Sequence, residues 1–579
     1  MCELRWLFLI AAAGCGVSEN PVSTECASKE LPLPRELSAG DLPDALFDED
    51  ADSFPIVSVE ITQAEWDAFC DNGYAAAQAF SVPEDYVHVW ARAKFTLAGE
   101  TLDDVGVRFM GRGTVQNVFC PHGDGGRSCD SAWRERCKAA LADDSERYED
   151  GVGQFLIKPS FKFDFDELSS GRDFHGVDRL NLAGDTGWQT LLDEWLPNLL
   201  YGRAGIGHVR TGHAALCING TYRGLYMIQE QSDQQSWLDE HQGGLEPAGD
   251  GAFFKIDGFG PQTYISDSFA DYVTVDDNDV ARSLYEPRAG TTDADGAELV
   301  SLFKELSYDT RGDESAFVAA AETRLDVDQW LTQMAMENAL GDSDAMYSNR
   351  NNYMLVKRVD NRWEPARFDP DQGSYWWLYE DEVWHDWPGD STLRGPSLMC
   401  LRFISSRAMP NCTDGGAPDD PDNSGFNVPN VRHPVIGARL LHAYSDPARD
   451  DYLDIVEELL APGGVLDIDD VLDLIDQRAA LIEPWVGNEK TPRIDPWGPD
   501  YYSWRFNVFG GDDATIADCR ENPEDFQIQC KYRQMVEFYL DEAPKMLEGI
   551  RAGTMPRECP RDEPENIGYD LPLDEYPCP

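Results

Sequence analysis

The stretch that says most about the fold is GDSDAMYSNRNNYMLVKRVDNRWEPARFDPDQG, residues 341–373. It carries acid and amide side chains in two groups, with an alternating segment typical of a β-strand and a turn between them. The groups consist of Asp342, Asp344, Asn349, Asn351 and Asn352 before the strand, and of Asp369 and Asp371 after the turn.

This order of groups makes phosphoryl transfer a concrete hypothesis. The active sites of protein kinases carry an Asp and an Asn on one loop and a further metal-binding Asp after a hairpin. Acid and amide side chains also cap helices and form turns, which is the plain structural alternative for each of these residues. The remainder of the chain has to decide between them.

The composition excludes some partners. The 579 residues carry a formal charge of −60 with a pI near 4.2, and a chain this acidic repels phosphate backbones and anionic lipid. We therefore expect no nucleic-acid partner. Solubility explains the charge most simply, while retention of Ca²⁺ or Mg²⁺ by acidic loops and a basic substrate are the alternatives.

The N-terminus predicts export. Residues 1–15 hold one Arg and an apolar run too short to cross a membrane, which is typical of a signal peptide. Residues 12–15, Ala-Ala-Gly-Cys, resemble the lipobox of bacterial lipoproteins, whose Cys is lipidated. We expect a cell-envelope lipoprotein, at the outer membrane or cell surface, that meets the membrane only through its lipid. A plain signal peptide and free secretion are the alternative.

Cysteine usage agrees with export. Of 14 Cys, removal of Cys2 with the signal and of Cys15 as the lipid site leaves an even number. No CxxC pair exists, so local disulfides that pin long loops are expected in an oxidising compartment. The candidates are Cys120, Cys129 and Cys137, then Cys400 and Cys412, Cys519 and Cys530, and Cys559 and Cys578. The pairing itself stays open.

Periodicity predicts an α+β chain. A Pro- and acid-rich tether, 16–52, precedes strands near residues 56–62, 155–165 and 177–184. Two strands within 87–113 are joined by a turn at Ala98-Gly99, and a further hairpin turns at Asn219-Gly220. A Cys-rich insertion covers 118–150, and helices are expected at 327–340 and in four segments from 433 to 552. A Pro- and acid-rich tail, 553–579, ends the chain.

Five segments in order resemble the spore-coat CotH kinase family. They are VGVRFMGRGT, KPSFKFDFDEL, GVDRLNLAGD, CINGTYRGLYMIQEQSD, and LDVDQWLTQMAMENALGDSDAMYSNRNNYML with RFDPDQG. The resemblance implies an atypical protein-kinase-like fold over residues 53–552. We expect an N-terminal antiparallel β-rich lobe, 53–260, and a mainly helical C-terminal lobe, 261–552.

The resemblance also implies residues on the phosphate side of a kinase site. Lys162 matches the strand lysine that touches ATP, Lys158 remains an alternative, and Glu230 matches the glutamate that orients the lysine. Gly111 and Arg112 match the glycine-rich element, in which Arg112 replaces a small polar residue. Arg112 grips phosphate or blocks the pocket, and both readings stay open.

On the metal side, Asp344 matches the family's catalytic base, and the neighbouring Asp342 could trade roles with it. Asn352 matches the metal-binding amide, although the usual kinase spacing selects Asn349 instead. Asp369 matches the Mg²⁺-binding aspartate, with Asp371 as a second ligand. Oxygen ligands suit Mg²⁺ or Mn²⁺, and Pro370 between the two acids departs from the family pattern.

The expected function is therefore an exported CotH-like kinase that transfers the γ-phosphate of ATP to Ser or Thr of an envelope or surface protein. Because Arg112 and Pro370 depart from the family, a non-catalytic surface adhesin or envelope-assembly scaffold on the same fold is the alternative. The acidic loops at 291–298 and 419–423 suggest structural Ca²⁺, but neither completes an EF-hand.

Overall fold

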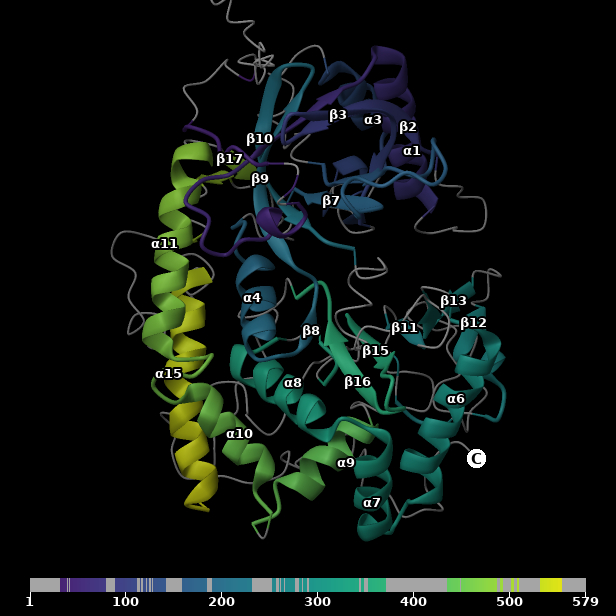
Figure 1. Ribbon diagram of the computed structural model, residues 1–579, viewed down its shortest axis with the longest axis vertical. Coiled ribbons are helices and arrows are strands. Elements are labelled where there is room, and N and C mark those ends of the chain that lie inside the picture. The colour runs from purple at the N-terminus through teal and green to yellow at the C-terminus, as the bar shows by residue number, and fades with distance from the viewer. Residues whose placement is uncertain are drawn as a thin grey trace, which may run out of the picture.

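The computed structural model consists of a β-barrel joined to a mainly helical part that is built around a second sheet (Figure 1). Placement is described for residues 26, 32–38, 40, 42–79, 89–111, 115, 118–120, 122–123, 126–127, 129–141, 159–184, 190–231, 252–256, 260, 262–264, 266–275, 281–283, 285–288, 291–342, 345–347, 352–370, 435–447, 449–486, 490–492, 501–503, 508–509 and 532–553.

The barrel contains seven strands among the described residues, in the order β1-β2-β3-β6-β7-β10-β9. Side chains alternate along each strand, and the apolar set, rich in Phe and Val, fills the interior. Their bounds are β1 Ile56–Glu60, β2 Ala91–Leu97, β3 Glu100–Phe109, β6 Phe161–Asp164, β7 Arg179–Ala183, β9 Thr211–Ile218 and β10 Thr221–Gln229.

Closure of the barrel differs from the predicted antiparallel lobe. β1 pairs with β9 in parallel, with Ile56 opposite Ala215 and Val59 opposite Ile218, and this pairing joins the two ends of the sheet. The alternation of a strand reports which face is buried and not which strand lies beside it. The prediction of an α+β chain is confirmed, and the closed barrel is a finding of the structure.

Both predicted hairpin turns are present. The β2–β3 turn has Ala98 at φ 54° and Gly99 at φ 76°, and the β9–β10 turn has Asn219 at φ 50° and Gly220 at φ 77°. Two consecutive residues with positive φ match the right-handed twist of the strands they join. Asn219 also bonds Ile61, donating from Nδ2 to its carbonyl and accepting from its N–H at Oδ1, each at 2.8 Å.

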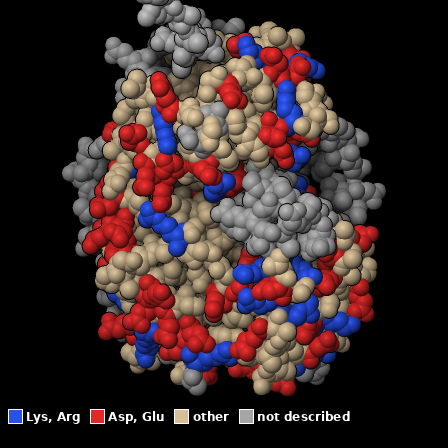
Figure 2. Space-filling view, viewed as in Figure 1, with Lys and Arg blue, Asp and Glu red and all other residues tan. Residues whose placement is uncertain are grey.

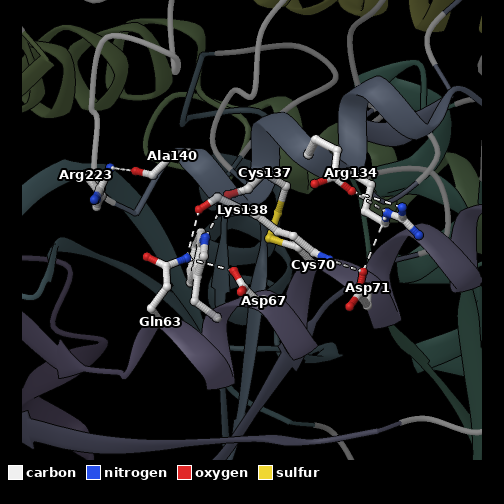
Figure 3. Close-up of a disulfide and its surroundings, with 11 residues drawn as sticks. Gln63, Asp67, Cys70, Asp71, Arg134, Cys137, Lys138, Ala140 and Arg223 are labelled. Carbon is white, nitrogen blue, oxygen red and sulfur yellow. Dashed lines mark hydrogen bonds and ion pairs between the residues drawn. A yellow bond between two sulfur atoms is a disulfide. The ribbon is translucent and has the colours of Figure 1, made fainter.

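The Cys-rich insertion is not only loop. It contains a helix, α3 (Ser131–Ala139), and two short strands, β4 (His122–Gly123) and β5 (Gly126–Arg127). A disulfide joins Cys137 on α3 to Cys70 on α1 (Gln63–Ala79), as Figure 3 shows. The insertion is thus fixed to the first helix of the chain.

Side chains from the barrel region satisfy the carbonyls at the end of α3. Trp66 donates to the Cys137 carbonyl at 2.7 Å, and Arg223 of β10 donates to the Ala140 carbonyl at 2.9 Å. Lys138 forms an ion pair with Asp71 at 2.7 Å beside the disulfide (Figure 3). A helix C-terminus leaves its last carbonyls without intrahelical donors, so these contacts hold α3 against the barrel.

Two further disulfides are described, and their spans differ. Cys120 pairs with Cys129 across 9 residues, which confirms a local pin within the insertion. Cys26 pairs with Cys217 of β9 across 191 residues. Two of the three described bridges are therefore long-range, contrary to the expectation of local loops, because cysteine spacing carries no information on chain segments that meet only in the fold. The other six candidate cysteines lie outside the described residues.

The second sheet has the order β14-β11-β15-β16-β8. Its strand β8 (Gly207–His208) pairs in parallel with β16 (Trp363–Arg367) and precedes β9 by two residues, so the barrel continues directly into this sheet. The other members are β11 (Phe253–Ile256), β14 (Glu286–Pro287) and β15 (Tyr353–Lys357). Since β11 precedes residue 260, the sheet of the helical part draws on the predicted N-terminal lobe.

Helices pack around this sheet and share one large apolar core with it. The helix expected at 327–340 is α8 (Val327–Leu340), and the four expected after residue 433 are also present (Figure 1). The remaining helical bounds are α4 Trp195–Arg203, α6 Asp293–Phe303, the π-helix η7 Lys304–Asp309, α7 Glu314–Arg324, α9 Val435–Tyr444, α10 Asp451–Leu460, α11 Ile468–Val486 and α15 Tyr532–Arg551.

Shorter elements complete the described chain: η3 Asp44–Leu46, η6 Phe269–Tyr272, β12 Val273–Val275, β13 Ala281–Ser283, β17 Lys490–Pro492 and β18 Tyr501–Ser503. Acidic side chains cover both the barrel and the helical part on the face shown in Figure 2, whereas Lys and Arg gather in small groups. In the part of the chain that is described, no helix is long and apolar enough to cross a membrane. The predicted signal segment 1–15 and the loop 419–423 lie outside that part.

Candidate functional site

The end of α8 begins the first half of the candidate site. Gly341 caps the helix in the left-handed conformation, φ 63°, and a Cβ there would come within 2.6 Å of the Tyr539 ring. Only glycine meets both requirements without strain. The turn delivers Asp342 to the interior, where it is 1% exposed.

The β15–β16 hairpin brings together two of the predicted metal residues. Tyr353 pairs with Arg367, so Asn352 before β15 and Asp369 after β16 lie at the same end of the hairpin. Both are left-handed, at φ 52° and 51°, a conformation that Asn and Asp adopt more readily than other side chains do. The Asn352 amide donates from Nδ2 to the Asp369 carbonyl at 3.3 Å.

The donor set at this hairpin end fits a hard divalent cation. Asn352 is buried and held in place, while Asp369 is exposed with its carboxylate available to a ligand. Amide and carboxylate oxygens are the ligands that Mg²⁺ and Mn²⁺ take. Asp371 lies outside the described residues, and among those described no group of three His, Cys, Asp or Glu forms a cluster.

A buried ion pair ties the two halves of the site together. Arg367 on β16 and Asp342 after α8 are 0% and 1% exposed, and Nη2 of Arg367 lies 2.6 Å from Oδ2 of Asp342. Nη1 of the same guanidinium donates to the Phe368 carbonyl at 2.8 Å and to the Asn352 carbonyl. One side chain therefore holds the loop after α8 and the residues next to both candidate ligands.

The charges of this pair depend on each other. Burial, the largest single cause, lowers the pKa of Arg367, but Asp342, Tyr201 and Glu337 together outweigh it, so the pKa of Arg367 stands above its usual value. Tyr201 contacts the same carboxylate at 3.4 Å, and burial followed by the Asp342 charge raises the pKa of Tyr201. Asp342 is thus placed as an anchor for Arg367. The alternative that Asp342 trades roles with Asp344, which lies outside the described residues, stays a prediction.

Glu337 organises the loop that follows. It is fully buried on α8, and its carboxylate accepts the backbone N–H of Tyr347 at 2.7 Å and of Met346 at 3.3 Å. The pKa of Glu337 is raised to about 7, chiefly by burial and also by the Asp342 charge, while Arg367 opposes the shift. The predicted base, Asp344, is flanked by segments that Asp342 and Glu337 anchor.

On the barrel, Lys162 of β6 lies on the outer face, because its neighbours Phe161 and Phe163 fill the interior. Its Nζ donates to Gln231 Oε1 at 2.6 Å. Glu230, next in the chain to Gln231, is 3% exposed and forms a two-pronged ion pair with Arg210, at 2.7 and 3.0 Å. The structure brings Lys162 to the segment of Glu230, and the orienting contact between their side chains stays a prediction.

The other predicted residues are only partly described. Gly111 is exposed at φ 76°, a left-handed position that suits glycine. Arg112, Lys158, Asp344, Asn349 and Asp371 lie outside the described residues. The choices between Lys158 and Lys162 and between Asn349 and Asn352 therefore stay predictions.

Sequence reasoning missed Arg367, Arg210 and Glu337. Arg367 occupies a core position in an alternating strand. Glu337 lies on the apolar face of α8, one helical turn after Gln333, whose Nε2 donates a hydrogen bond of 2.8 Å to its carboxylate. A charged residue at a position where the pattern expects an apolar one signals a buried ion pair. For Arg210 we find no comparable signal, since its position between two strands is ordinary for an arginine.

A family model described as CotH kinase protein matches residues 152–493. The match includes β6, β7, β9, β10, α8 and the β15–β16 hairpin, and so covers Lys162, Glu230 and the Asn352–Asp369 end. It starts after β1, β2, β3 and the Cys-rich insertion. A search of curated proteins finds no match to the chain.

Proposed function

This chain belongs to the CotH kinase family, and on that premise we propose that it is a metal-dependent protein kinase acting on Ser or Thr of an envelope or surface protein. The observation that carries the proposal is the shared hairpin end of Asn352 and Asp369, held by Arg367 against the loop after α8. An amide and a carboxylate from one hairpin end, beside a loop with a further acid, are what phosphoryl transfer requires.

Each residue has one role in the proposal. Asp344 accepts the proton of the acceptor hydroxyl, whose oxygen bonds to the γ-phosphorus of ATP as the bond to the β-phosphate oxygen breaks and ADP leaves. Lys162 neutralises phosphate charge, and Glu230 and Gly111 shape the segments around it. Asn352, Asp369 and Asp371 hold Mg²⁺ or Mn²⁺, which supplies positive charge opposite the phosphates. The barrel and the helical part then correspond to the two lobes of an atypical kinase-like fold.

The cellular setting is part of the proposal. Three disulfides are stable only in an oxidising compartment, which supports export. A lipid on Cys15 anchors the chain to the envelope, close in sequence to Cys26, which a disulfide joins to Cys217 of the barrel. The charge of −60 favours a basic acceptor protein.

The test is transfer of labelled γ-phosphate from ATP with Mg²⁺ to a basic protein. Asp344→Ala and Asp369→Ala should each lower the rate at least about 100-fold, since each removes a group that acts on the reacting atoms. Asp360→Ala is the matched control, because Asp360 is an exposed acid at the other end of the same hairpin and pairs with its near neighbours Arg358 and Arg362. Equal rates for all three variants would refute the assigned site. ATP binding with no transfer by the unchanged protein would favour the scaffold alternative.

A further inference from the structure

Four polar side chains form a row across neighbouring strands of the barrel. In antiparallel pairs, residues directly opposite each other project from the same face of the sheet. The register of β3, β6, β7 and β10 places Arg108 opposite Lys162, Lys162 opposite Asn181, and Asn181 opposite Gln229. A residue from each of four strands, far apart in sequence, thus shares one face.

That face is the outer one, directed toward the helical part. The residues adjacent to the row, such as Val107, Phe163 and Ile228, belong to the barrel interior. Two residues further along the same face, Ala183 and Met227 belong instead to the core shared with the helices. The polar row therefore borders the junction between the barrel and the helical part.

The junction also contains the candidate metal residues. Gln229, at one end of the row, pairs with Thr211 at the start of β9. Two residues separate Thr211 from β8, whose His208 lies opposite Arg367 of β16. Asp369 follows Arg367 by two residues, so the row and Asp369 are linked through β9, β8 and β16 at the junction of the two sheets.

Two cations stand directly opposite each other in the row. Arg108 and Lys162 are both half-buried and project from the same face, so one anionic ligand can contact both. The chain has 107 acidic residues and only 47 Lys and Arg, so a facing pair of cations in a half-buried position is an unusual use of its few bases. A polyanion is the class of ligand that such a pair suits.

Arg108 is also held in a fixed position. Its guanidinium lies over the Trp90 ring, 4.9 Å from the ring centroid, and Nη1 donates to the Phe109 carbonyl at 3.0 Å. Stacking of this kind restrains the planar group and reduces the entropy lost when it binds a ligand. The restraint favours recognition of an oxyanion, for which the guanidinium offers paired N–H donors.

We propose that Arg108, together with Lys162, binds the phosphates of a nucleoside triphosphate. The inference rests on the proposed function, which already uses Lys162, and adds Arg108 as a second phosphate-binding residue. Lysine contributes a point charge, and arginine contributes charge and direction. The polyphosphate spans from the facing cations toward Asp369, two residues after the end of β16.

The test measures binding of inorganic tripolyphosphate, of ATP with Mg²⁺, and of adenosine by calorimetry on the full chain. Arg108→Gln should weaken tripolyphosphate and ATP binding by about 10- to 100-fold and leave adenosine binding unchanged, because only the phosphates contact the guanidinium. Arg108→Lys keeps the charge without the paired donors. Its affinity for tripolyphosphate and ATP should lie between those of the unchanged protein and of Arg108→Gln. This variant also provides the comparison if the Gln variant folds poorly.

Arg92→Gln is the matched control, since Arg92 lies on the neighbouring strand β2, is exposed, and pairs with Asp104. It should bind all three probes as the unchanged protein does. Tripolyphosphate affinity that survives in both Arg108 variants, or that is absent from the unchanged protein, overturns the inference. Arg108-dependent binding without phosphoryl transfer supports the inference and refutes the proposed kinase activity, so the two failures are distinguishable.

Discussion

Replacing Arg367 by methionine tests whether one buried ion pair holds the candidate site together. Methionine fills much of the same volume but removes the charge and every hydrogen bond of the guanidinium. The Asp342 carboxylate, 1% exposed, then loses its cation, and the carbonyls of Asn352 and Phe368 lose a donor. The change acts at the point where the loop after α8 meets the β15–β16 hairpin.

The expected cost follows from the burial of both partners. Removing one member of a fully buried pair leaves an uncompensated charge and typically costs about 3–5 kcal/mol of unfolding free energy. The matched control is Arg92→Met, because the Arg92–Asp104 pair is about half exposed at 51% and 48%. Water and salt screen such a pair, so its loss should cost less than about 1 kcal/mol.

Equilibrium denaturation followed by tryptophan fluorescence measures both costs. We expect Arg367→Met to lower the unfolding free energy by several times the loss in Arg92→Met. The double variant Asp342→Leu with Arg367→Met should recover part of it, because no charge is then left buried alone. A loss in Arg367→Met no larger than that in the control would show that the pair contributes little and that the hairpin is held by other contacts.

Three further predictions concern single features of the fold. The folded pKa of Glu337, about 7, lies above its usual 4.5, so its protonated form stabilises the fold fully below about pH 4.5 and this contribution is lost as pH rises to about 7. Glu337→Gln should remove this part of the pH dependence when the unfolding free energies of the two proteins are measured against pH. Replacing Cys70 and Cys137 by Ala opens a disulfide across 67 residues and should lower the unfolding free energy by about 4 kcal/mol through chain entropy. Replacing Cys120 and Cys129, which are 9 residues apart, should lower it by about 3 kcal/mol. A larger loss for the shorter loop in denaturation would contradict the loop-length argument. Asn219→Ala should lower the unfolding free energy by about 3 kcal/mol, because it removes two hydrogen bonds to Ile61 and leaves a left-handed backbone that alanine disfavours. Asn219→Gly should lower it by less, and equal losses would mean that the backbone conformation is not strained.

Local signals predicted the elements well. The Asn219-Gly220 turn, the helix at 327–340 and the strands of the candidate hairpin follow from positive-φ residues and from periods of 3.6 and 2. The same signals could not predict the closing pair of β1 with β9, since every strand with an apolar face is a plausible neighbour of every other. Tertiary packing chose that pair.

The candidate site divides in the same way. The order of acid and amide around one hairpin was visible in the sequence, and the register of β15 and β16 is what places Asn352 beside Asp369. The partner of Glu230 was not visible, and the structure gives it Arg210. Charge partners 20 residues apart depend on strand register, and register depends on which neighbours the barrel supplies.

By itself, then, the sequence determined the helices, the strands, the tight turns and the family pattern, because these depend on residues close together in the chain. Only the tertiary structure decided that Arg367 is buried against Asp342, that Cys70 meets Cys137, and that Arg108 faces Lys162. Each of these contacts joins segments whose proximity costs chain entropy, and only the packing of the whole core compensates for that cost.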